Sequence, residues 1–261
     1  MASTASARFS PWETIDRRSN RREMLVQSLP RISAALPQQQ LSGVKSCAML
    51  GCGRGHNELA FVGGCLPNVA KLTAVEPDAD QVAALETRVA QLLPNVSTEF
   101  CQETAQSWQG ADEPFDAVLL FHCLYFVPPS ERPALLEKLF DNVAPNGGLV
   151  FVLTSPCDRE NPPAMNRLFD RLSVSSYNQF DVVDGVQVCD MMTSVGFRRC
   201  YQLPIQHEID VAEPNDDVME ALSFLSRGKL GVTEVRDAAR EVIGSATAVQ
   251  HDMWFGVFEK P

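Results

Sequence analysis

Three glycines in the stretch CAMLGCGRGH, residues 47–56, constrain the fold more than any other feature of the sequence. Gly51, Gly53 and Gly55 come directly after a short apolar run that is typical of a buried strand. Their spacing is G-x-G-x-G, which differs from the G-x-G-x-x-G of dinucleotide-binding folds and from the phosphate loop that ends in Lys-Ser/Thr. A plain tight turn is one interpretation. A loop whose backbone lies close to a ligand is the other, because glycine permits such an approach.

Strand-like and helix-like segments alternate after this loop. The pattern predicts strands at 46–50, 71–77, 96–101, within 115–127 and at 149–155, and helices at 56–66, 78–93 and 130–144. Asp78 and Asp80 stand at the start of the second helix, and Ser130 is the expected N-cap of the third. Strands that alternate with helices pair in parallel, so we expect a doubly wound α/β sheet.

The last hundred residues are less regular. Helical patterns cover 181–197, 217–227 and 233–243, and strand patterns cover 198–209 and 251–260. Two late strands suit an antiparallel edge of the same sheet. We expect one body in three parts: an N-terminal helical segment (1–45), a ligand-binding core (46–155), and a region with substrate-binding insertions and the final strands (156–261).

Composition excludes several classes of function. Lys and Arg number 22 against 33 Asp and Glu, a net charge of -11, which argues against a nucleic-acid binder. No apolar run is long enough for a membrane span, and the N-terminal MASTASARFSP lacks the apolar centre of a secretory signal; a transit remnant is the alternative there. The eight cysteines form no C-x-x-C pair, which favours a reducing, cytoplasmic setting without a metal site. We expect a monomer that acts on a small molecule.

An acid at the end of the second strand narrows the choice of ligand. Ligands of doubly wound sheets bind at the carboxyl ends of the strands, where both the glycine loop and Glu76 are expected. A carboxylate there suits the two hydroxyls of a ribose, as in sites for NAD and for S-adenosylmethionine. A G-x-G-x-G loop without a further glycine has no pyrophosphate to hold, which favours S-adenosylmethionine.

The stretch 47–155 resembles class I methyltransferases in the order and spacing of its elements. Within that superfamily the chain is similar to the histamine N-methyltransferases, through the motifs GCGRGHNEL, AVEPDADQ, CQETAQSW, HCLYFV, YNQFDVVDGVQVCDMMTSVGF and HDMWFGVFEK. The resemblance implies a Rossmann-like, mostly parallel sheet of seven strands with an antiparallel C-terminal edge and a small helical cap. It also implies S-adenosylmethionine as the cofactor.

The resemblance carries over to particular residues. The expected cofactor positions are Gly51, Gly53, Gly55, Glu76, Gln81, Thr104, Ala105 and Phe121. His122 and Tyr125 are the expected catalytic residues, because an imidazole can orient or deprotonate an amine and an aromatic face attracts a methyl-bearing cation. Phe126, Gln179 and His251 are expected to line the substrate pocket, whereas His56 and His207 are expected at the surface or as caps.

The N-terminal segment departs from the family's pattern. Where the family places an amine-binding acid, this chain has RRSNRREM (17–24), with Arg21 or Arg22 near the acid's position. Arginine repels a cation and holds a carboxylate, so we expect an amine or imidazole substrate that also carries an acid group. A solvated helix face and an RNA-docking patch are the other interpretations of these arginines. Methylation of oxygen, sulfur or an RNA base, or cofactor binding without catalysis, are the alternatives for the whole chain.

Overall fold

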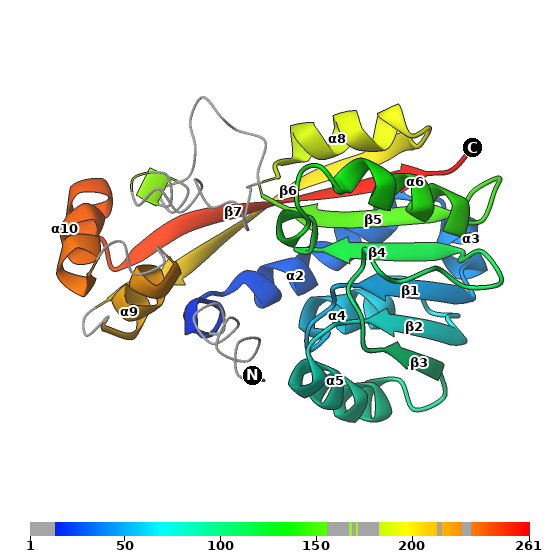
Figure 1. The fold of residues 1–261 in the computed structure, drawn as a ribbon, viewed down its shortest axis with the longest axis horizontal. Coiled ribbons are helices and arrows are strands. Elements are labelled where there is room, and N and C mark those ends of the chain that lie inside the picture. Colours follow the sequence, from blue (N-terminus) through cyan, green and yellow to red (C-terminus); the bar gives the residue numbers. More distant parts are fainter. Residues whose placement is uncertain (1–13, 156–166, 169–170, 172–182, 213–215, 226–230) are drawn as a thin grey trace.

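A seven-stranded mixed sheet organises the molecule. The computed structural model describes residues 14–155, 167–168, 171, 183–212, 216–225 and 231–261. The described strands are β1 (Ser46–Leu50), β2 (Lys71–Val75), β3 (Ser97–Cys101), β4 (Ala117–Phe121), β5 (Leu149–Thr154), β6 (Arg198–Asp210) and β7 (Ala248–Glu259). They lie in the order β3-β2-β1-β4-β5-β7-β6, with β7 antiparallel to both of its neighbours (Figure 1). The predicted fold class is confirmed.

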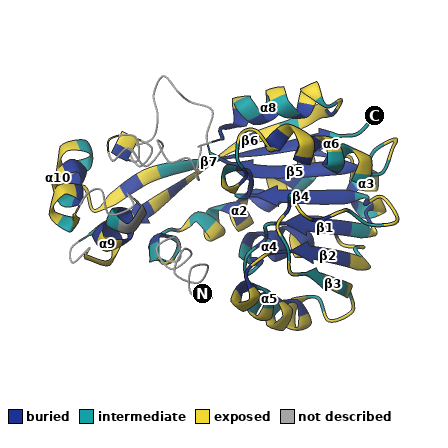
Figure 2. Ribbon diagram, viewed as in Figure 1, coloured by how far each residue is buried: buried dark blue, intermediate teal, exposed yellow. Residues whose placement is uncertain are grey.

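Helices cover both faces of this sheet. The described ones are α2 (Arg21–Ala35), α3 (Gln38–Gly43), α4 (His56–Cys65), α5 (Ala79–Leu92), α6 (Arg132–Asn142), α8 (Gly185–Ser194), α9 (Asp216–Leu225), α10 (Val232–Ile243) and the 3-10 turn η1 (Leu124–Phe126). Side chains of α2, α4 and α5 join one core cluster, and those of α6 and α8 join another. Successive residues of β1 alternate between the two clusters because strand side chains point to opposite faces. Figure 2 shows β1, β4 and β5 buried between these layers.

A second, smaller core lies at the far end of the two antiparallel strands. β6 and β7 extend beyond the parallel strands and carry α9 and α10 there (Figure 1). Ile209, Val218, Leu222, Val235 and Val249 are buried together in this distal lobe. In the part of the chain that the structure describes, no helix is long and apolar enough to cross a membrane.

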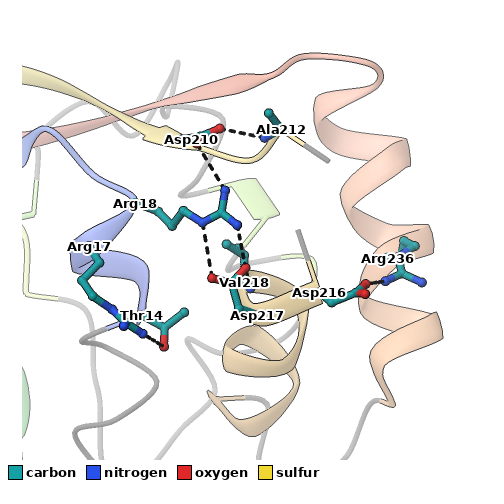
Figure 3. Close-up of polar contacts among 9 residues, drawn as sticks. All are labelled: Thr14, Arg17, Arg18, Asp210, Ala212, Asp216, Asp217, Val218 and Arg236. Atoms are coloured by element: carbon teal, nitrogen blue, oxygen red, sulfur yellow. Dashed lines mark hydrogen bonds and ion pairs between the residues drawn. The ribbon is translucent and has the colours of Figure 1, made fainter. Parts of the chain in front are cut away.

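Ion pairs fasten the N-terminal segment to the distal lobe (Figure 3). The guanidinium of Arg18 donates to Asp210 at the end of β6 (3.2 Å) and to Asp217 in the first turn of α9 (2.9 Å). Arg236 of α10 bonds to Asp216 of α9. One arginine therefore links the N-terminal segment to the end of β6 and the start of α9, which lie 192 and 199 residues further along the chain.

Helix starts and ends differ in places from the sequence expectations. Ser130 is not the N-cap of α6; Glu131 holds that position without a side-chain cap. The reason is a turn in which the Glu131 N–H donates to the Pro128 carbonyl (2.9 Å), so that the helix begins one residue later than expected. The helix expected over 181–197 is shorter, Gly185–Ser194, and starts at a capping box of Asp184 and Gln187.

Phe61 joins α4 to the sheet, and its loss should be costly. Its ring centroid lies 5.6 Å from Phe121, 4.7 Å from Phe151 and 5.6 Å from Phe255, and its side chain is fully buried. We expect Phe61→Ala to lower the free energy of unfolding by about 3–5 kcal/mol, because it leaves a cavity. Urea denaturation measures this. Leu92→Ala, at a side chain that is 58% exposed, is the control and should change stability by no more than about 0.5 kcal/mol.

Candidate functional site

The glycine loop lies at the carboxyl ends of β1 and β2 and requires its glycines. Gly51, Gly53 and Gly55 have φ angles of 61°, 52° and 68°, in the left-handed region that favours glycine. A Cβ on Gly51 would lie 2.8 Å from Cβ of Cys123, and one on Gly55 would lie 2.3 Å from Cδ1 of Leu85. A side chain at either position would therefore displace the strand-to-helix turn that opens α4.

Glu76 faces this loop from the end of β2. One carboxylate oxygen accepts a hydrogen bond from the Gly53 N–H (2.8 Å) and the other from the Asp78 N–H (3.1 Å). The side chain is buried, and burial raises its pKa above the ordinary value. Each oxygen can accept a second hydrogen bond, so the acid retains acceptor capacity for two ribose hydroxyls. Asp78 caps α5 and accepts from the N–H of Gln81, whose side chain lies beside Gly53.

A lysine anchors the loop that carries Thr104 and Ala105. Thr104 is exposed and its Oγ1 accepts from the Ser107 N–H (3.1 Å), while Ala105 is buried. Nζ of Lys138, on α6, donates to the carbonyls of Ala105 (3.0 Å) and Trp108 (2.5 Å). Sequence analysis missed this lysine, because nothing local marks a partner on another helix.

The end of β4 presents His122 and two aromatic rings. Phe121 is buried, and His122 has a φ of 53°, an uncommon value for a residue with a side chain. The ring centroid of Tyr125 lies 6.1 Å from that of His122 and 4.9 Å from that of Phe126. Phe126 is 38% exposed.

Arg132 fixes the turn that carries these rings. It is buried, and its Nε donates to the carbonyls of Leu124 (3.2 Å) and Val127 (3.0 Å). Burial raises the pKa of Tyr125 above its ordinary value, so this side chain stays a phenol.

Three imidazoles and one guanidinium meet beside this turn. His207 of β6 stands opposite His251 of β7 in the strand register, with ring centroids 4.8 Å apart. Burial, with the charge of Arg21 as a further cause, lowers the pKa of His207 to about 2, that of His251 to about 4, and that of His122 well below its ordinary value. We call His122, His207, His251 and Arg21 the imidazole cluster. Its three imidazoles are neutral at pH 7.

His207 corrects the sequence interpretation, which placed it at the surface or as a cap. Its side chain is only 3% exposed. It occupies the buried register of β6, between Ile205 and Ile209. A histidine in the apolar register of an alternating strand is the signal that could have identified it.

The segment before α2 aligns Arg21 with the cluster. Ser19 pairs with Ile209 of β6, and its Oγ lies 3.0 Å from Nδ1 of His207 and accepts from the Arg21 N–H (3.1 Å). The serine hydrogen is then free to point at Nδ1, which leaves the imidazole proton on Nε2. Nη2 of Arg21 donates to Asp16 (2.5 Å).

Buried polar atoms in the cluster lack hydrogen bonds. Among the residues that the structure describes, Nε2 of His122, Nε2 of His207 and Nε of Arg21 are buried without a partner. Such atoms are rare in folded proteins, so these three are candidates for hydrogen bonds to water or to a polar ligand. No group of three or more His, Cys, Asp or Glu side chains in the described ranges could hold a metal ion.

The remaining expected residues lie elsewhere. Arg22, next in sequence to Arg21, bonds to His56 rather than joining the cluster. Gln179 lies outside the described residues. Glu58, which sequence analysis did not single out, is buried in the first turn of α4, and burial raises its pKa to about 8.

Comparison with known proteins identifies the domain. Residues 48–147 match a family model described as a methyltransferase domain. The match covers 100 of the 261 residues. The loop, Glu76 and the end of β4 all fall within these residues, and the match supports S-adenosylmethionine, the expected cofactor.

Two solved structures share the fold over most of the chain. A putative methyltransferase from Bacillus halodurans is 14% identical, with a TM-score of 0.63, over 90% of this chain and 98% of the other. The magnesium protoporphyrin IX methyltransferase of Synechocystis, solved with bound SAH, is 10% identical, with a TM-score of 0.56, over 95% of this chain and 86% of the other. At these identities the likeness concerns the fold.

A curated protein is similar to about half of this chain. Carboxy-S-adenosyl-L-methionine synthase of Chromohalobacter salexigens is 25% identical over 135 residues, 51% of this chain and 49% of that protein. The match therefore spans about half the length of this curated relative.

The loop geometry predicts that substitutions of two glycines have different effects. Gly55 is the N-cap of α4, and Gly63 lies within this helix. We expect Gly55→Ala to weaken S-adenosylmethionine binding at least tenfold, because the left-handed φ and the overlap with Leu85 shift the loop. Gly63→Ala, in the same helix with open space around its Cβ, should instead stabilise the fold by about 0.5–1 kcal/mol and leave binding unchanged. Isothermal titration and thermal melting measure the two effects; equal binding by both variants would contradict the assignment.

Glu58 predicts a pH dependence of stability. Its folded pKa of about 8 exceeds the ordinary value of 4.5 for a glutamate, so the stability that the protonated acid contributes is lost as pH rises towards 8. Between pH 6.5 and 8 the wild type should lose about 1–2 kcal/mol relative to Glu58→Gln. Denaturation at a series of pH values measures this, and parallel curves for the two proteins would show that Glu58 ionises normally.

Proposed function

We propose that the chain is an N-methyltransferase similar to histamine N-methyltransferase, whose acceptor is a small amine or imidazole compound that carries a carboxylate. The observation that supports this is the imidazole cluster. It places one guanidinium among three neutral rings, next to the end of β4. A cation in that position disfavours a purely cationic amine and favours an acceptor with an acid group.

Arg21 is the residue that would hold the carboxylate. Its Nε is buried without a partner among the described residues, so an incoming carboxylate oxygen would satisfy it. Asp16 takes only Nη2 and keeps the guanidinium in place. The buried Nε2–H of His207 would supply a second donor beside it.

His122 would act on the nitrogen that receives the methyl group. S-adenosylmethionine, when bound, supplies an electrophilic methyl group on a sulfonium. A neutral His122 can accept the proton that the attacking nitrogen loses, and it is neutral at pH 7 because of burial and the charge of Arg21. Tyr125, held as a phenol, and Phe126 would present aromatic faces to the methyl-bearing cation.

The other expected positions complete this proposal. Gly51, Gly53, Glu76 and Gln81 would contact the methionyl and ribose parts of the cofactor, and Thr104, Ala105 and Phe121 its adenine side. The division into 1–45, 46–155 and 156–261 follows the same roles, with the first and last parts supplying the acceptor site. His251, opposite His207, would line that site.

A second candidate function is the modification of S-adenosylmethionine itself. The relative that this chain matches over half its length is named as a carboxy-S-adenosyl-L-methionine synthase. In that case Arg21 would hold the carboxylate of a carboxyl donor, and no acceptor would be methylated.

One experiment separates these functions. The full chain is incubated with S-adenosylmethionine and, in turn, histamine, amino acids and the amine precursors of betaines, and products are analysed by mass spectrometry. Gain of a methyl mass on a carboxylate-bearing amine, with formation of the demethylated cofactor, is the expected result. A clear preference for histamine contradicts the proposal, and a carboxyl mass gained by the cofactor itself supports the second function.

Substitution of Arg21 tests the carboxylate site. We expect Arg21→Gln to raise KM for the carboxylate-bearing acceptor about 10–100-fold, because a charge-assisted hydrogen bond is lost. Turnover of histamine should not fall, since the repulsive charge is removed. Arg17→Gln, at an exposed arginine that bonds to Thr14, is the matched control. Equal loss of activity on both kinds of acceptor would show that Arg21 has only a structural role.

A further inference from the structure

A half-buried serine contacts the buried imidazole of His207. Oγ of Ser19 lies 3.0 Å from Nδ1 of His207, and it accepts a hydrogen bond from the Arg21 N–H (3.1 Å). The backbone of Ser19 also bridges to Ile209 of β6, two residues beyond His207. The position of this hydroxyl beside Nδ1 therefore follows from backbone pairing as well as from the side-chain contact.

The other contacts of the serine decide the direction of the proton between these two side chains. Oγ accepts the Arg21 N–H, and among the described residues no acceptor other than Nδ1 of His207 lies within hydrogen-bond distance of the hydroxyl. The Glu208 carbonyl also affects the pKa of His207, but its hydrogen bond is to the Asn20 N–H (3.2 Å). A neutral imidazole has one donor and one acceptor nitrogen, so an acceptor at Nδ1 makes Nε2 the donor.

The donor that results is buried. His207 is only 3% exposed, and its Nε2 has no hydrogen-bond partner in the part of the chain that the structure describes. The buried Nε of Arg21 is in the same condition. A buried N–H that lacks an acceptor is unfavourable, so a ligand that supplies an oxygen there gains affinity. Arg21 and His207 both offer donors to such a ligand, and neither offers it an acceptor.

We propose that Ser19 is a positioning residue that sets the acceptor preference of the site: its hydroxyl keeps the proton of His207 on Nε2, so that this ring offers a hydrogen-bond donor to a carboxylate and no lone pair to an ammonium group. This inference rests on the proposed function, in which the methyl acceptor carries an acid group. The serine adds a second filter to the charge of Arg21, because a carboxylate accepts hydrogen bonds and an ammonium group can only donate them. The other tautomer of His207 would present the opposite polarity at the same place.

Two substitutions of Ser19 keep or reverse the polarity of this contact. Ser19→Thr keeps the hydroxyl and should leave the tautomer of His207 as in the wild type. Ser19→Asp places a carboxylate beside Nδ1, which can accept from the Arg21 N–H as the hydroxyl does but cannot donate to the ring when ionised. We expect the proton of His207 to move to Nδ1 in this variant, which leaves a lone pair on Nε2. Ser19 is only partly buried, so there is room for the larger side chains.

The tautomer is measured without any enzyme assay. Nitrogen-15 NMR of the labelled full chain distinguishes protonated from unprotonated ring nitrogens, and His207→Gln assigns the signals among the four histidines. At pH 8, well above the pKa of His207 (about 2), we expect Nε2–H in the wild type and in Ser19→Thr, and Nδ1–H in Ser19→Asp. Asn20→Asp is the matched control and should leave the tautomer unchanged. It adds the same charge one residue away, at an exposed side chain whose Oδ1 accepts from the Glu208 N–H (2.8 Å).

A matched pair of ligands measures the preference of the site. Imidazole-4-acetate and histamine share an imidazole ring and differ in carrying a carboxylate or an ammonium group. Isothermal titration of the full chain, with the demethylated cofactor present, gives the affinity for each. We expect the ratio of the two affinities to shift about tenfold or more towards histamine in Ser19→Asp relative to Ser19→Thr, because the carboxylate loses a donor and meets a lone pair. Asn20→Asp should shift this ratio by no more than about threefold, because an exposed charge is screened.

The outcomes for Ser19 and for the proposed function are distinct. A proton on Nδ1 in the wild type, or the same tautomer in Ser19→Asp as in Ser19→Thr, overturns the role of Ser19. An equal shift of the ligand ratio in Asn20→Asp and Ser19→Asp also overturns it, because charge alone would then be the cause. A wild type that prefers histamine overturns the proposed class of acceptor, whereas the tautomers and the change of ratio between the Ser19 variants still decide the role of the serine.

Discussion

The site depends on a backbone pairing between the N-terminal segment and β6. Asn20 donates to the Glu208 carbonyl (3.2 Å), and the N–H of Asp210 donates to the Arg18 carbonyl (2.7 Å). This short ladder sets where α2 begins, and with it the directions of Arg21 and Arg22. Without it, the imidazole cluster would not have its guanidinium from α2.

Charge is distributed unevenly in this acidic chain. Adjacent arginines serve two separate groups: Arg21 lies among neutral imidazoles, and Arg22 lies beside two further arginines. Burial keeps the imidazoles uncharged, so the guanidinium groups dominate the local field of both groups. The cofactor loop lies near both and contributes Arg54 to one of them.

Local patterns in the sequence were sufficient for the fold and for the cofactor edge. The order of strands and helices, the glycine loop and Glu76 all follow from apolar periodicity and from residues with restricted or unusual backbone preferences. The glycine loop and Glu76 lie at the same edge of the sheet because parallel strands have their carboxyl ends on one side. The position of His122 at the end of a buried strand was predicted in the same way.

Residues that act through distant partners were not predictable in this way. Ser19 reaches His207, Lys138 reaches the Ala105 carbonyl, and Arg54 acts on Arg88, and none of these pairs has a local signature. Glu58 carried a weak signal, as an acid within an otherwise apolar helix. The separation of Arg21 from Arg22 depends on the start of α2, which only the pairing with β6 determines.

The same pairing affects the order in which parts of the chain can fold during translation. The Glu208 N–H bonds to the side chain of Asn20 across a sequence separation of 188 residues. At ribosomal rates this is a delay of about 10–40 s, during which β1 to β5 and the cofactor loop can already fold. The proposed acceptor site is therefore assembled late, from segments that are translated far apart, and a nascent chain without β6 has a cofactor edge with no such site beside it.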